Sequence, residues 1–211
     1  MNDDFLDRLA SDAVAVRRVD SSRFATLFGL AALTSAAIIV GLSGMRADLA
    51  EVVVSPMFLW KLAAMGTVAL LAVPMLAAAG RPGAATPRIG HAAIAGLVLL
   101  GLPLVYAVAT QPPAESMNGL EATRGLGCLF WTVAASVPVW LASLVWLREA
   151  APTDLGRASW SAGIASGAVA ATLFVLHCPY DDIVYVAVWY GASVALVAGF
   201  TRLLLPRLIR W

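Results

Sequence analysis

Six long runs of apolar residues, separated by short polar stretches, dominate the hydropathy pattern of this chain. The runs cover residues 24–44, 57–79, 91–109, 126–147, 158–177 and 183–205. Each is close to the ~20 residues that an α-helix needs to cross a hydrocarbon layer about 30 Å thick. The pattern predicts an all-α membrane protein in which residues 24–211 form a bundle of six transmembrane helices.

Composition supports a membrane protein over a soluble one. Apolar residues make up 61% of the chain and charged residues 13%, whereas about a quarter of the residues in ordinary soluble domains are charged. Pro74, Pro103 and Pro138 fall inside the runs, and proline is tolerated in membrane helices because neighbouring helices satisfy the freed backbone groups.

The distribution of cationic residues predicts the orientation of the bundle. Eleven of the fourteen Lys and Arg residues lie before the first run, in the second and fourth connections, or at the end of the chain; Arg46, Lys61 and Arg124 are the others. Cationic side chains next to a span resist translocation, so we expect both termini in the cytoplasm. Lys61 lies inside the start of the second predicted helix, where we expect its side chain to extend toward the membrane surface.

Residues 1–23 form a separate segment with the pattern of an amphipathic helix. At 100° per residue its apolar side chains gather on one side, opposite three aspartates and Arg18; they are Phe5, Leu6, Leu9, Ala13 and Val16. A helix this short is marginal alone in water. We expect it to dock on a partner protein, on membrane lipid or on its own bundle.

Several function classes find no support in the sequence. The net charge is +1 without a basic cluster, which gives no support for direct nucleic-acid binding. The chain also has neither a Walker loop nor a glycine-rich dinucleotide motif.

The two cysteines of the chain are predicted to lie at the same membrane face, opposite the N-terminal segment. Cys128 opens the fourth run and Cys178 follows the fifth, so the two thiols are expected at the same depth. A disulfide is reasonable there if the two helix ends are neighbours and the compartment is oxidising. The start of a helix also tends to lower the pKa of a thiol such as that of Cys128.

Further metal-binding residue types surround Cys178. His177, Asp181 and Asp182, together with the two cysteines, supply the thiolate, imidazole and carboxylate donors that zinc, cadmium or copper bind. An inert pair of cysteines stays open as the alternative, with Asp181 or Asp182 capping the sixth helix.

Other residues of the last two runs have structural interpretations. Tyr185 and Tyr190 are expected in the aromatic belt at the membrane interface. Gly163 and Gly167, four residues apart, are expected to let two helices approach closely.

Three stretches of the sequence resemble one family. They are LDRLASDAVAVRR at 6–18, LHCPYDD at 176–182 and VAVWY at 186–190, and the chain resembles the negative-regulator-of-sigma-F (NrsF-like) membrane anti-sigma factors over its whole length. The resemblance implies a protein of the bacterial inner membrane that is not an enzyme. It would hold an extracytoplasmic-function sigma factor and free it under heavy-metal or oxidative stress.

The resemblance also implies roles for particular residues. Cys128 and Cys178 would be the sensing thiols. Residues 1–23 would bind the sigma factor, through Leu6, Leu9, Asp12, Arg17 and Arg18 of the matching stretch together with Phe5, Ala13 and Val16 of the apolar face. No resident cofactor is expected, only a transiently bound heavy-metal ion such as zinc or cadmium.

Three other functions are alternatives to this interpretation. A membrane thiol oxidoreductase usually has a closely spaced pair of cysteines, and this chain has none. A metal permease should carry polar ligands near the middle of its spans, whereas here the charges and histidines lie at the edges. A purely structural membrane subunit is the third alternative.

Overall fold

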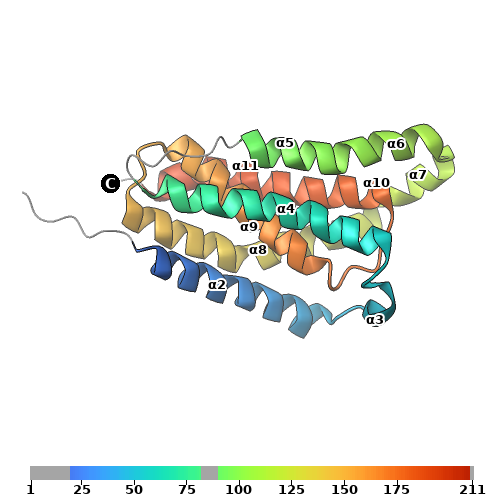
Figure 1. Ribbon diagram of the computed structural model, residues 1–211, viewed down its shortest axis with the longest axis horizontal. Coiled ribbons are helices and arrows are strands. Elements are labelled where there is room, and N and C mark those ends of the chain that lie inside the picture. The colour runs from blue at the N-terminus through green and yellow to red at the C-terminus, as the bar shows by residue number, and fades with distance from the viewer. Residues whose placement is uncertain (1–19, 82–89, 210–211) are drawn as a thin grey trace, which may run out of the picture.

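The structure is a computed structural model that describes residues 20–81 and 90–209. These residues form a bundle of long helices without a strand (Figure 1). The long segments are α2 (Ser21–Ile38) with η1 (Ile39–Ser43), α4 (Pro56–Ala79), α5 (Gly90–Gly96) with η2 (Leu97–Gly101) and α6 (Leu102–Thr110), α8 (Ala122–Ala150), α9 (Leu155–Phe174), and α10 (Ile183–Tyr185) with η3 (Val186–Tyr190) and α11 (Gly191–Leu208). Two short helices, α3 (Leu49–Val52) and α7 (Pro113–Gly119), lie in connections. The all-α prediction is confirmed.

Within the described residues, five helical stretches are long and apolar enough to cross a membrane: Ser21–Ser43, Pro56–Ala79, Gly90–Thr110, Pro113–Ala150 and Ile183–Leu208. The exception among the six expected spans is α9, which is rich in glycine and serine. It lies in the middle of the bundle and packs against α2, α4, α8 and α11 (Figure 1). Its surface meets other helices, so it does not need large apolar side chains. The number of spans and their orientation stay predictions.

Local sequence explains where several helices begin. Ser55 accepts a hydrogen bond from the Phe58 amide at 3.2 Å, and Pro56 occupies the first turn of α4. Asp154 caps α9 in the same way, accepting from the Arg157 amide at 2.9 Å. The first long helix begins at Ser21, three residues before the predicted run, because Asp20 caps it.

The predicted close approach at Gly163 and Gly167 is confirmed. A Cβ atom on Gly163 would lie 2.5 Å from the Cα atom of Ala198, and one on Gly167 would lie 3.0 Å from the Cα atom of Val194. The backbones of α9 and α11 therefore touch where neither glycine has a side chain.

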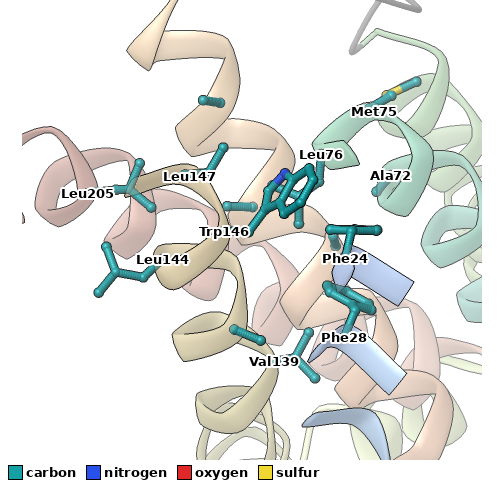
Figure 2. Close-up of a cluster of buried hydrophobic side chains, with 14 of the residues drawn as sticks. Phe24, Phe28, Ala72, Met75, Leu76, Val139, Leu144, Trp146, Leu147 and Leu205 are labelled. Carbon is teal, nitrogen blue, oxygen red and sulfur yellow. The ribbon is translucent and has the colours of Figure 1, made fainter. Parts of the chain in front are cut away.

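One end of the bundle holds both the start of α2 and the end of α11, and we call it the Ser21 end. There the indole of Trp146 packs on Phe24 with ring centroids 4.9 Å apart, beside Leu76 and Leu147 (Figure 2). Polar contacts join the same helix ends: Arg23 pairs with Glu149 at 2.7 Å, and Arg148 donates to the Leu208 carbonyl at 2.9 Å.

Candidate functional site

The opposite end of the bundle brings the two cysteines together, and we call it the thiol end. Cys128 lies on α8, and Cys178 lies in residues 175–182, the cysteine loop that joins α9 to α10. Both thiols are free, and the two residues line the same cavity. Cys128 is 4% exposed and Cys178 is 2% exposed. The two cysteines are therefore neighbours that are shielded from solvent.

The position of Cys128 within its helix differs from the prediction. α8 begins at Ala122, not near residue 126, so Cys128 lies in the second turn. The free amide groups of a helix N-terminus act mainly within the first turn. The expected activation of Cys128 by a helix end is therefore wrong.

A cavity of about 250 Å³ gives the thiols a small open space. Both sulfur-bearing residues line it, together with Arg124, His177 and Tyr180. A second cavity of about 370 Å³ shares Arg124 and Tyr180 with the first. The guanidinium carbon of Arg124 lies 5.5 Å from the centroid of the Tyr180 ring. This pair of side chains therefore lines both cavities.

The buried ammonium of Lys61 on α4 binds the cysteine loop. Its Nζ donates to the carbonyl oxygens of Tyr180 at 2.9 Å and Cys178 at 3.2 Å, and pairs with Asp181 Oδ1 at 2.8 Å. An ammonium has three donors, so all three are used. Lys61 is 0% exposed. The expectation that it extends to the membrane surface is wrong, because the loop carbonyls and Asp181 supply the partners that water would otherwise provide.

Arg46, in the link between α2 and α3, binds the same loop from the other side. It is 7% exposed. Its guanidinium meets Asp48 through Nε at 2.8 Å and Nη2 at 2.9 Å, and meets Asp181 through Nη2 at 2.9 Å and Nη1 at 3.2 Å. Nη1 also donates to the Cys178 carbonyl at 3.2 Å. All five guanidinium donors have a partner. We call Arg46, Asp48, Lys61 and Asp181 the Asp181 ion cluster.

The cluster balances two cations against two carboxylates. Burial alone would favour neutral Asp181, but hydrogen bonds from Arg46 and Lys61 outweigh it and lower the pKa of that carboxyl group. The hydrogen bonds from Arg46 lower the pKa of Asp48 in the same way. Both carboxylates therefore stay charged at neutral pH.

The cluster also influences the neighbouring thiol. The pKa of Cys178 is lowered to about 6. The neighbouring Cys128 thiol and the positive charge of Lys61 both lower this pKa, and together they outweigh burial, which raises it. A thiolate is the form that attacks electrophiles and binds metals. Cys178 is thus the cysteine whose surroundings favour reaction near neutral pH.

The structure does not gather the five predicted metal-binding residues into one group. The His177 ring lies 2.8 Å from the Gly44 carbonyl through Nδ1, Asp181 belongs to the ion cluster, and Asp182 caps α10 by accepting from the Tyr185 amide at 2.7 Å. Across residues 20–81 and 90–209, no three His, Cys, Asp or Glu side chains are arranged to hold a metal ion. Of the predicted set, the structure brings together the two cysteines.

Two tyrosines expected at the membrane interface lie inside the protein. Tyr185 is buried and donates to the Arg124 carbonyl at 3.2 Å. Tyr190 is also buried, and its ring lies 5.7 Å from Lys61 Nζ. The aromatic-belt interpretation is wrong for both because the sixth helical segment turns this face toward the thiols.

Comparison with known proteins places the chain in a family. Residues 9–211 match the family model described as negative regulator of sigma F. The chain belongs to the NrsF family. It is 29% identical over 217 residues to the anti-sigma-F factor NrsF of Caulobacter vibrioides, and 31% identical over 215 residues to the probable anti-sigma-F factor NrsF of Azospira oryzae. Each alignment covers 99% of both chains.

The resemblance found in the sequence is therefore confirmed. Both NrsF relatives are named as regulators, not as enzymes. No solved structure matches the chain.

The ion cluster contains three residues that the sequence pattern did not assign to the site: Arg46, Asp48 and Lys61. The pattern favoured a role in orientation for Arg46 and a surface position for Lys61, although both bind the Cys178 carbonyl. A signal for Lys61 was available, since an ionisable residue within a predicted span usually marks a functional site.

The predicted partner-binding residues of the NrsF chain fall outside the described residues. They are Phe5, Leu6, Leu9, Asp12, Ala13, Val16, Arg17 and Arg18. Their role stays a prediction.

Proposed function

We propose that this protein is an inner-membrane anti-sigma factor. It holds an extracytoplasmic-function sigma factor through residues 1–23, and a metal ion or an oxidant that acts on Cys128 and Cys178 releases that factor. The match of residues 9–211 to the NrsF family carries the proposal, and two full-length relatives named as anti-sigma-F factors support it.

The arrangement of the helices fits a signal that crosses the bundle. The Ser21 end directly follows the N-terminal segment, whereas the thiols lie at the other end. With the Ser21 end in the cytoplasm, as the Arg distribution predicts, the thiols face the periplasm. Five helices that meet the length and hydropathy of a span support the membrane location.

The chemistry of the thiol pair supports a sensing role. A peroxide can oxidise Cys178 to a sulfenic acid, and the Cys128 thiol then displaces water to form a disulfide. Two thiols thereby lose two electrons and two protons, and the peroxide is reduced to water or alcohol. A soft metal ion such as cadmium would instead be held by both sulfur atoms, with the protons passing to solvent.

Affinity purification from native membranes tests the anti-sigma function. We expect a sigma factor in the eluate of the wild-type protein. Leu9→Asp, on the apolar face of residues 1–23, should abolish its recovery, whereas Ser11→Asp on the polar face should retain it. Absence of any sigma factor from the wild-type eluate, or full recovery with Leu9→Asp, contradicts the proposal.

The sensing step has a separate test. The Cys128→Ser/Cys178→Ser protein should still bind the sigma factor but should not release it when cells meet cadmium or peroxide. The measurement is transcription of a sigma-dependent reporter. Undiminished induction in the double variant would show that the signal is sensed elsewhere.

A further inference from the structure

The residues that follow α2 and η1 are bonded to the cysteine loop at Leu176, His177 and Cys178. After α2 and η1 the chain turns at Gly44, which has a φ of 79°. The Gly44 carbonyl lies 2.8 Å from His177 Nδ1, and the Arg46 amide donates to the Leu176 carbonyl at 3.1 Å. The Arg46 side chain then reaches the Cys178 carbonyl at 3.2 Å. A displacement of the cysteine loop therefore acts directly on residues 44–46.

The ion cluster holds residues 44–46 and the cysteine loop together. Every donor of Arg46 and of Lys61 is paired, either with a carboxylate of the cluster or with a carbonyl of the cysteine loop, and both side chains are buried. Pulling the loop away from Arg46 would leave a guanidinium and a carboxylate without full compensation in a water-poor site, which is strongly unfavourable. The link from α2 should therefore move together with the loop.

α2 is well suited to move as a unit. It has few buried side chains, and they face α8 and α9, whereas large residues such as Leu30 and Leu33 are exposed. A helix that packs along one face can shift with limited loss of contacts. Its last turn is the π-helical η1, a form that is often found at functional sites and adapts to changes in register.

We propose that the Asp181 ion cluster couples the state of Cys178 to the position of α2, with Arg46 as the residue that makes the connection. α2 then carries the change along the bundle to the Ser21 end, where the N-terminal segment leads into α2. This inference rests on the proposed function and identifies its route of transmission. Arg46 and Lys61 act as positioning residues, since neither is expected to react.

Replacing Arg46 tests the coupling, with reporter induction and thiol chemistry measured in the same cells. Arg46→Gln keeps a polar side chain but cannot bridge Asp48, Asp181 and the Cys178 carbonyl. We expect sigma-factor binding at rest and oxidation of both thiols to persist, while induction falls at least about fivefold, the lower end of common allosteric couplings. Arg46→Lys, which keeps a cation beside Asp181, should restore part of the induction.

Glu51→Gln is the matched control at the same end of the bundle. Glu51 is exposed on α3, outside the ion cluster and the thiol cavity, so the variant should induce like the wild type. Wild-type induction with Arg46→Gln would overturn the inference. If the wild-type protein binds no sigma factor, the proposed function fails instead, which separates the two outcomes.

The unmodified protein offers a second test that is independent of whether the variants fold. Hydrogen exchange of the protein in lipid nanodiscs should differ between its thiol and disulfide forms at the backbone amides of residues 40–49. The Arg46 amide is the most direct probe because it binds the Leu176 carbonyl. Equal exchange of this stretch in the two forms would also overturn the inference.

Discussion

Replacing Lys61 by methionine should destabilise the protein through the loop that it binds. Lys61 is the only lysine of the chain, and its ammonium contacts Asp181 and two carbonyl groups. The variant leaves the Tyr180 carbonyl without this donor and Asp181 with Arg46 as its remaining cation. Breaking a buried ion pair typically costs about 3–5 kcal/mol. We expect about 3 kcal/mol, since Arg46 still compensates Asp181.

The coupling between Lys61 and Asp181 can be measured with a double-mutant cycle. Asp181→Asn should cost about 4 kcal/mol, because it leaves the fully buried ammonium without a carboxylate partner. Independent effects would sum to about 7 kcal/mol. Because both changes remove the same ion pair, the Lys61→Met/Asp181→Asn protein should lose only about 5 kcal/mol, a coupling of roughly 2 kcal/mol.

The assay is reversible unfolding in mixed micelles by titration with sodium dodecyl sulfate. Arg157→Met is the control, since Arg157 and Asp154 form an exposed pair at 3.3 Å, and it should change the free energy of unfolding by less than about 1 kcal/mol. If the losses of the two single variants add to that of the double variant within about 0.5 kcal/mol, the buried ion pair does not stabilise the loop as described.

Three further predictions concern the helix contact and the thiols. Gly163→Ala should lose about 2 kcal/mol of stability, because the new Cβ atom would lie 2.5 Å from the Cα atom of Ala198. Gly66→Ala is the control: its new Cβ atom would have no atom within 4 Å, so the variant should be neutral or stabilised by up to about 1 kcal/mol. In the Cys128→Ser protein, Cys178 is the remaining thiol and the serine hydroxyl can still donate a hydrogen bond. Alkylation of Cys178 by a small reagent should accelerate as the pH rises through about 6 and should level off above about 7, because the thiolate is the reactive form. Mild oxidation of membranes should form a disulfide between Cys128 and Cys178 within one chain, detected by mass spectrometry as the loss of two hydrogen atoms.

For each of these three predictions, a specific result would contradict it. Equal stability of the two glycine variants in the same micelle titration would deny the close contact of α9 with α11. An alkylation rate that still climbs steeply between pH 7 and pH 9 would mean that Cys178 has the pKa of an ordinary thiol, near 8.5. Disulfides found only between chains would mean that the two thiols do not meet as described.

Much of the fold follows from local sequence. The run at residues 57–79 became α4, Pro56–Ala79, and that at 183–205 became the segment from α10 to α11, Ile183–Leu208. The ends agree closely because their signals are local: Ser55 and Asp182 each cap the helix that follows. α8 is the exception. It starts at Ala122, so Cys128 is in its second turn.

The candidate site was harder to predict from sequence. Placing both cysteines at one end of the bundle needed only alternating helix direction, but the surroundings of each thiol depend on which helices are neighbours. Asp181 and His177 were expected to bind metal, yet they bind Arg46 and the link after α2. The residues that bind the loop come from positions far away in the chain.

The sequence by itself determined the apolar helices, their alternating directions and the family, because hydropathy, capping and motif are properties of consecutive residues. Tertiary structure alone decided that α9 is the central helix and that Lys61 is buried against Cys178 and Asp181. A charged residue in an apolar run has no local partner. Its burial and its role depend on the loop, more than a hundred residues later in the chain, that supplies its hydrogen bonds.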